Sequence, residues 1–149
     1  MSDVMHTTIA WSGDTQDPAY NRVSELAKPG GRTAVPASSS PKHGGDGACW
    51  NPEDLLSAAL AECYMLTFLA LATKTRLAVK DYRGTSEAAL ETVDRVTRVA
   101  SITLRPTITV APGTDHAKVL EMFAKAHKYC TIANSINSRV IAEATVVEA

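Results

Sequence analysis

The segment 51–71, NPEDLLSAALAECYMLTFLAL, predicts one long helix. Asn51 is a favourable N-cap residue, Pro52 suits the first turn, and two acidic residues follow at the positive end of the helix dipole. Between positions 55 and 72 the only charged residue is Glu62, and apolar residues surround almost the whole helix. A helix of this composition is buried on most sides, so we expect it at the centre of the fold.

The same segment is close to the lower length limit for a membrane span. Three acidic residues lie at or inside its start, however, which disfavours insertion into a bilayer. The whole chain is 45% hydrophobic and 21% charged, which is typical of a soluble globular protein. We therefore expect a core helix and no membrane partner.

Length and charge limit the domain organisation and the partners. The chain of 149 residues is long enough to bury a core, and we expect a single domain over 1–149. Fifteen basic and sixteen acidic residues leave a net charge of −1, so there is no basic surface for a nucleic-acid partner. The first residues lack the basic and apolar regions of a secretory signal, which favours a cytoplasmic location.

Apolar periodicity and turn residues predict the remaining elements. Residues 36–50 are rich in proline, serine and glycine, which indicates a long loop and a candidate cover for a functional site. The order of elements predicts an α+β fold with mostly antiparallel pairing. The expected strands are 6–11, 20–27, 77–90, 95–110 and 139–148, with a turn at 91–94 and a second helix over 114–130 that is capped by Thr114 or Asp115.

A small sheet covers only one face of the helix at 51–71. The simplest cover for the other face is the same helix of a second copy, related by a two-fold axis. We therefore expect a homodimer with a large interface.

The three cysteines are too few, and odd in number, for a disulfide scaffold, so thiol chemistry is open. Cys63 lies well inside the helix, beyond the reach of the terminal dipole, so we expect any lowering of its pKa to need a nearby cation. Taken alone, Cys63 is more often a packing residue. Cys130 follows the second helix, near the start of a further helical turn whose amides favour a thiolate. Cys49, in the glycine-rich loop, is interpreted as an incidental thiol.

His127 raises a metal-binding alternative. His-x-x-Cys spacing to Cys130, together with Cys63, is compatible with zinc, but no fourth ligand or CxxC accompanies the three residues. We therefore favour a site without metal. His127 is also a candidate base, although a histidine late in a helix more often complements the negative end of the dipole.

The segments NPEDLLSAALAECYMLTFLAL and AHKYCTIANSIN (126–137), in this order, resemble the OsmC/Ohr family of thiol peroxidases. The resemblance covers nearly the full chain. It implies an intertwined homodimer in which antiparallel sheets wrap around two long central helices. It also implies reduction of organic hydroperoxides in the oxidative stress response, with a dithiol reductant (lipoyl or small thiol) as a partner and no cofactor.

Carried over to this chain, the resemblance makes Cys63 the peroxidatic thiol and Cys130 the resolving thiol, which together form a disulfide after oxidation. Glu53 matches the family glutamate that holds an arginine beside the reactive sulfur. Arg22, in YNRVS, is our candidate for that arginine. The alternatives for this cation are Arg32 and Lys42.

Ten helical residues separate Glu53 from Cys63, which is about 15 Å along the axis. Direct contact therefore needs the partner subunit or a bridging side chain, and we expect the active site at the dimer interface. The residues Tyr64, Met65 and Phe68 are expected in the core, with some lining an apolar pocket that favours organic hydroperoxides. The alternative function is a non-catalytic dimer of the same fold, acting as a stress-related binding protein or redox sensor.

Overall fold

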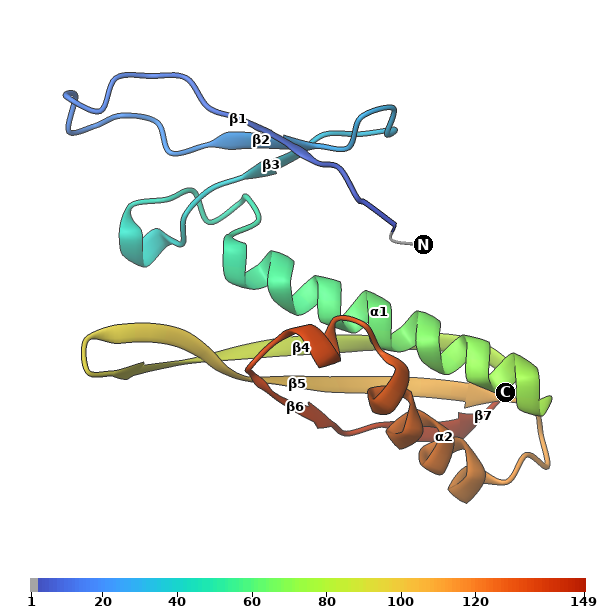
Figure 1. Cartoon of the computed structure of the whole chain (residues 1–149). Coiled ribbons are helices and arrows are strands. Elements are labelled where there is room, and N and C mark those ends of the chain that lie inside the picture. The colour runs from blue at the N-terminus through green and yellow to red at the C-terminus, as the bar shows by residue number, and fades with distance from the viewer. Residues whose placement is uncertain (1–2) are drawn as a thin grey trace. The chain divides into compact units, whose positions relative to one another are not determined.

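The computed structural model describes residues 3–149, in two units, Met1–Leu55 and Leu56–Ala149. The first unit holds a three-stranded antiparallel sheet in the order β1-β2-β3. The expected strand 20–27 begins only at residue 24, because the Asn21 side chain accepts a hydrogen bond from the Val23 N–H and makes a local turn. The strands are β1 Thr8–Ala10, β2 Ser24–Ala27 and β3 Val35–Ala37 (Figure 1).

The segment 36–50, predicted as a loop, is ordered by its own hydrogen bonds. The N–H of the buried Ser38 donates to the Trp50 carbonyl at 2.9 Å, which closes the segment at its base. Gly45 lies so close to Ser39 that an added Cβ would overlap the Ser39 carbonyl oxygen, so only glycine fits there. One 3-10 turn, η1 Pro41–His43, lies within the segment.

Helix α1, Pro52–Thr75, confirms the long helix expected from the segment 51–71. Its start is fixed by a reciprocal capping arrangement. The Asn51 side-chain oxygen accepts from the Asp54 N–H at 2.8 Å, and the Asp54 carboxylate accepts from the Asn51 N–H at 3.1 Å.

One stripe of α1 is buried, whereas the opposite face is not. Leu60, Tyr64 and Phe68 belong to the hydrophobic core of the second unit, but Leu66 is 52% exposed. In the single chain the sheet thus covers one face of α1, as expected, and burial of the other face by a second copy stays a prediction. By length and composition α1 is able to cross a membrane, but its buried stripe makes it a core helix of this fold.

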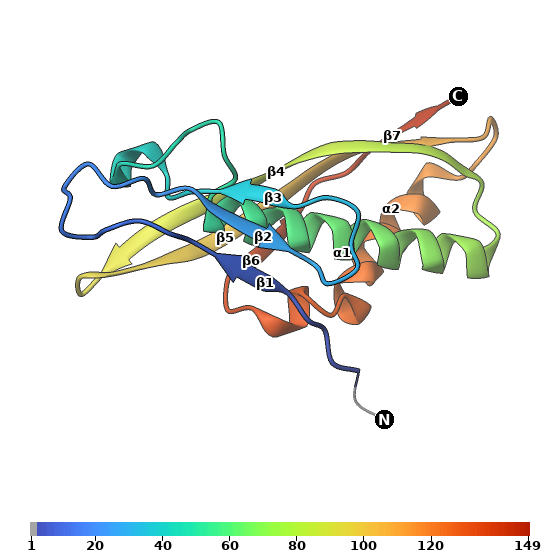
Figure 2. The same ribbon diagram turned by 90° about the horizontal axis from the view of Figure 1, so that it is seen from above.

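Helices α1 and α2 cover the same face of the sheet in the second unit, along strands β4 and β5 (Figure 2). The Phe123 ring of α2 lies 4.9 Å from that of Tyr64 and 5.7 Å from that of Phe68, both on α1, and 6.4 Å from that of Tyr82 on β4. Asp115 caps α2 as expected, since its side chain accepts from the next N–H groups. The elements are β4 Val79–Val93, β5 Val96–Val110, α2 His116–Tyr129, η2 Ala133–Ser135, β6 Arg139–Ala142 and β7 Thr145–Glu148.

Two details of this sheet differ from the expectation. The turn predicted at 91–94 lies at Asp94 and Arg95, because cross-strand pairing continues to Val93 opposite Val96. The predicted antiparallel pairing holds for β4 with β5, but β6 and β7 are both parallel to β5. The reason is that α2 carries the chain back, so the strand after it runs in the direction of β5.

The single strand expected at 139–148 is two strands. β6 pairs with 101–104 of β5, and β7 pairs with 107–110. The interruption falls opposite Arg105 and Pro106, where proline has no N–H to donate to a neighbouring strand.

Candidate active site

The structure brings Cys63 and Cys130 together. Cys63 lies on α1 just before Tyr64, whose ring packs against Phe123 of α2. Cys130 ends α2 seven residues after Phe123, which is two helical turns along the same face. Each thiol is close enough to hydrogen-bond with the other and to shift its pKa. Cys63 is partly exposed, whereas Cys130 is 0% exposed.

The segment after α2 aims backbone amides at the two sulfurs. The Ala133 N–H donates to Cys130 Sγ at 3.4 Å. The Asn134 side chain donates to the Cys130 carbonyl at 2.8 Å and to the Lys128 carbonyl at 3.1 Å, so it caps the end of α2 and holds the turn in place. The further helical turn expected after Cys130 is confirmed by η2, which lies within residues 131–136.

These contacts give the two thiols opposite character. Burial raises the pKa of Cys63, but the amides of Ile132 and Thr131, the Cys130 thiol and the Thr67 hydroxyl outweigh it, and the pKa lies below its ordinary value. Burial and the neighbouring Cys63 raise the pKa of Cys130 despite hydrogen bonds from Ala133 and Ile132. Cys63 is therefore the more acidic thiol of the pair.

The source of this effect differs from the expectation. We expected a cation to lower the pKa of Cys63, but the contributions come from amides, the second thiol and the Thr67 hydroxyl. Thr67 follows Cys63 by four residues and shares its helix face, so the spacing could have identified it. Tyr64 forms a neutral wall of the site, because burial and then Cys130 raise its pKa to about 12.

Arg22 and Glu53 belong to the first unit, whereas both cysteines belong to the second. The Arg22 guanidinium carbon lies 4.1 Å from the Tyr20 ring centroid, and its Nη1 donates to the Tyr20 carbonyl at 3.4 Å. Glu53 lies in the first turn of α1. Within residues 3–149 neither residue forms an ion pair, so the expected Glu53–Arg22 pair is absent from this part of the chain.

Of the remaining candidates, Arg32, Lys42 and Cys49 belong to the first unit and His127 to the second. Arg32 and Lys42 are exposed on the first unit. Partial burial and the Asp46 carboxylate raise the pKa of Cys49, which disfavours a reactive thiolate there. His127 is exposed and stacks on Tyr64 with ring centroids 6.5 Å apart. No three His, Cys, Asp or Glu residues in 3–149 form a metal-binding group, so the zinc alternative lacks its ligand set.

Comparison with known proteins agrees with this arrangement of two helices on one sheet. An OsmC-like protein of unknown function from Vibrio cholerae has a TM-score of 0.88 at 28% identity, covering 97% of this chain and 100% of that chain. An organic hydroperoxide resistance protein, OsmC, from Legionella pneumophila has a TM-score of 0.68 at 21% identity, covering 97% of this chain and 98% of that one. The organic hydroperoxide resistance protein OhrB of Bacillus subtilis has a TM-score of 0.68 at 17% identity, with the same two coverages.

At these identities the last two proteins bear on the fold alone. No curated protein matches the chain. The family model for OsmC-like proteins matches residues 44–144, which is more than half of the 149 residues and includes both cysteines of the site. The chain therefore belongs to the OsmC-like protein family.

Proposed function

We propose that the protein is a cysteine-based peroxidase that reduces organic hydroperoxides, and also hydrogen peroxide, through a Cys63 sulfenic acid and a Cys63–Cys130 disulfide. The observation that carries the proposal is the pair of adjacent thiols with pKa values shifted in opposite directions. A peroxidase of this type needs one acidic thiol, whose thiolate attacks the peroxide, and a second thiol beside it to resolve the sulfenic acid.

The first step is attack of the Cys63 thiolate on the outer peroxide oxygen. An S–O bond forms, the O–O bond breaks, and the leaving alkoxide takes a proton to become an alcohol. In the second step the Cys130 sulfur attacks the Cys63 sulfur and the S–O bond of the sulfenic acid breaks. The leaving hydroxide takes the Cys130 proton to become water, and the disulfide forms. No step requires a metal or an organic cofactor.

A dithiol reductant then restores the two thiols by exchange. We expect it to attack the sulfur of Cys63, because Cys63 is partly exposed and Cys130 is fully buried. A lipoyl group or another small thiol fits this requirement. We place the reaction in the cytoplasm, where thiol reductants are plentiful.

The surroundings of Cys63 support organic hydroperoxides as the preferred substrates. Cys63 packs with other partly buried residues against the hydrophobic core of the second unit. An apolar lining of this kind favours the organic body of an alkyl hydroperoxide over the smaller, fully polar hydrogen peroxide.

In this proposal Arg22 and Glu53 complete the site at a homodimer interface. Arg22 has no carboxylate partner within residues 3–149, so its guanidinium is available for Glu53 and a thiolate of the assembled dimer. The test is the rate of peroxide reduction by Arg22→Met, with Arg32→Met as the matched control. Loss of rate in both variants, or in neither, would remove Arg22 from the site.

One observation favours the second candidate, a redox sensor. When a reductant attacks Cys63, Cys130 is the leaving thiol, and a raised pKa makes it a poorer leaving group. Slow reduction of the disulfide would keep the protein oxidised as a signal. The sensor is supported if oxidation is fast but dithiols restore the thiols over hours.

The experiment treats the reduced protein with one equivalent of cumene hydroperoxide, or of hydrogen peroxide, and follows the products by mass spectrometry. We expect rapid formation of the Cys63–Cys130 disulfide. Cys63→Ser should abolish it, and Cys130→Ser should leave a persistent sulfenic acid. Cys49→Ser is the matched control and should behave as the natural chain. Intact Cys63 and Cys130 thiols after minutes would refute the proposal.

A further inference from the structure

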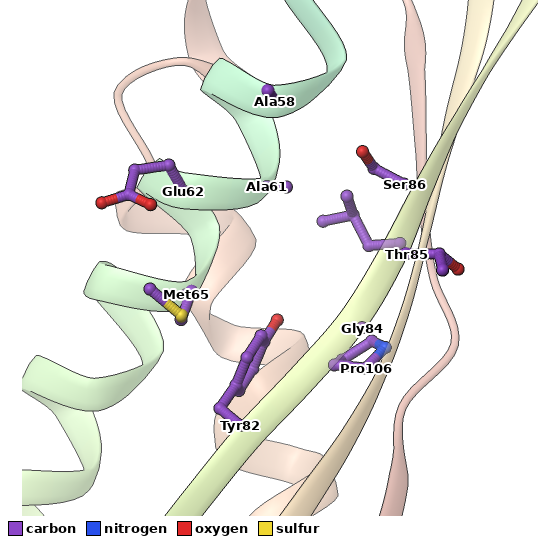
Figure 3. A pocket seen from close by; sticks show the side chains of 10 residues that line it. Ala58, Ala61, Glu62, Met65, Tyr82, Gly84, Thr85, Ser86 and Pro106 are labelled. Atoms are coloured by element: carbon purple, nitrogen blue, oxygen red, sulfur yellow. The ribbon is translucent and has the colours of Figure 1, made fainter. Parts of the chain in front are cut away.

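A cavity of about 270 Å³ lies in the second unit between α1 and strands β4 and β5 (Figure 3). On the helix side it is lined by Ala58, Ala61 and Met65. Ala61 and Met65 each stand two residues from Cys63, which turns them about 200° away around the helix. The cavity is therefore on the opposite side of α1 from the two thiols.

The cavity exists because both of its walls lack bulk. Two alanines face it from α1, and Gly84 faces it from β4. A Cβ on Gly84 would lie 2.6 Å from Pro106 Cα and 2.8 Å from the Arg105 carbonyl oxygen, so the close approach of β5 requires glycine. No larger side chain at position 84 can fill the space from the sheet.

Three lining residues carry a hydroxyl group, namely Tyr82, Thr85 and Ser86. The Thr85 oxygen points away from the cavity (Figure 3), which leaves Tyr82 and Ser86 as its hydrogen-bond donors. The Tyr82 hydroxyl points into it (Figure 3), and within residues 3–149 no group accepts a hydrogen bond from it. Burial and then Tyr64 raise the pKa of Tyr82 to about 12, so the hydroxyl keeps its proton. Ser86 accepts from the Ser57 hydroxyl at 2.8 Å, which leaves the Ser86 proton for another acceptor.

The charges around the cavity disfavour ions. Among the described residues that line the cavity, Glu62 is the only charged one, and its carboxylate is turned away from the cavity at the rim (Figure 3). No Lys, Arg or His occurs among the described lining residues. An anion in the cavity would lose its hydration without a cation in return.

We propose that this cavity is a binding site for a small neutral ring compound that carries a hydroxyl or carbonyl oxygen. The ring fits the apolar walls of Ala61, Met65 and Leu104, and the oxygen accepts hydrogen bonds from Tyr82 and Ser86. The size agrees, since a closed apolar cavity of about 150 Å³ is enough for benzene. The site is independent of the proposed peroxidase reaction, because it uses neither thiol.

The test titrates benzyl alcohol into protein with ¹³C-labelled alanine and methionine methyl groups. We expect the Ala58, Ala61 and Met65 signals to shift, whereas Ala117, which is exposed on α2, should not. Toluene, which has no oxygen, should bind roughly thirtyfold more weakly, as expected for the loss of the two net hydrogen bonds from Tyr82 and Ser86. Benzoate should bind the most weakly of the three.

Variants locate the site and separate it from the thiols. Ala61→Leu should fill the cavity and weaken benzyl alcohol binding at least tenfold, and Ala117→Leu is the matched control. Tyr82→Phe, a milder change, should weaken benzyl alcohol roughly fivefold and leave toluene unchanged. Cys63→Ser should bind as the natural chain does. The absence of any shift, shifts away from the cavity, or full binding by Ala61→Leu would overturn the proposal.

Discussion

Cys63 and Cys130 carry pKa shifts of opposite sign, and the hydrogen bond between them contributes to both. Cys130→Ala removes this donor, so the pKa of Cys63 should rise. Cys130→Ser keeps a hydroxyl donor and should raise it less. Because only the thiolate is alkylated, a higher pKa moves the pH profile of iodoacetamide alkylation to higher pH. The measurement is made in a Cys49→Ser background, and equal profiles for alanine and serine would contradict the prediction.

Thr67 offers a second test of how the thiolate is stabilised. Its hydroxyl donates its one proton to the Cys63 carbonyl at 2.8 Å, and it lowers the pKa of Cys63 when it donates to the sulfur instead. Thr67→Val should therefore move the alkylation profile of Cys63 to higher pH. Thr73→Val is the matched control, because the exposed Thr73 hydroxyl makes the same backbone contact, to Leu69 at 2.9 Å, away from the thiols. If Thr73→Val moves the alkylation profile as far as Thr67→Val does, the change comes from the lost hydrogen bond to the helix backbone. The Thr67 hydroxyl would then have no specific effect on the pKa of Cys63.

At the residue scale the motifs in the sequence selected the two cysteines that the structure brings together, but the sequence did not predict which groups lower the pKa of Cys63. Cys63 and Cys130 were identified through their motifs, because a separation of 67 positions carries no information on proximity. Within the single chain the pKa of Cys63 is lowered without the expected cation, and the reason is physical. The amides of Thr131 and Ile132 act on Cys63 only after α1 and α2 have packed, and single-chain periodicity does not predict such packing.

The β4–β5 hairpin offers a prediction at the scale of one element. Its two turn residues, Asp94 and Arg95, both have positive φ, 51° and 66°, as in a type I′ turn. A non-glycine residue in this region costs about 1 kcal/mol. Asp94→Asn with Arg95→Gly should therefore raise the free energy of unfolding by about 1 kcal/mol, measured by urea denaturation.

The control for this prediction is glycine inside a strand. Arg98 lies in β5. Arg98→Gly should lower the free energy of unfolding by about 0.5 to 1 kcal/mol, because glycine relieves no backbone strain there and loses more conformational entropy on folding than arginine does. Stabilisation by Arg98→Gly, or none in the turn variant, would show that backbone strain does not limit the hairpin.

The boundaries that the sequence missed also have local causes. The segment 139–148 has the composition of one strand, yet it divides because its partner β5 contains Pro106. That constraint belongs to the partner, so inspection of 139–148 alone does not reveal it. The helices were predicted better, since Asn51 and Asp115 are caps that act within their own segment.

At the scale of the whole molecule, the exposed face of α1 gives the last prediction. Leu66 is 52% exposed in a helix whose opposite stripe is fully buried, and Ala59 and Ala70 are exposed beside it. An apolar face of this kind supports the predicted homodimer. Leu66→Asp should convert a dimer into a monomer in size-exclusion chromatography with light scattering. Leu120→Asp, at a 42% exposed leucine of α2, is the matched control and should remain dimeric.

The same variant connects assembly with activity. Glu53 lies about 15 Å along α1 from the Cys63 of its own chain, so a partner subunit is the simplest source of a Glu53–Arg22 pair beside the thiolate. A monomeric Leu66→Asp protein should then keep the thiol pair within its second unit but reduce hydroperoxide more slowly. If the monomer reduces hydroperoxide at the full rate, the second unit is sufficient, and the amides of Thr131 and Ile132 replace the cation altogether.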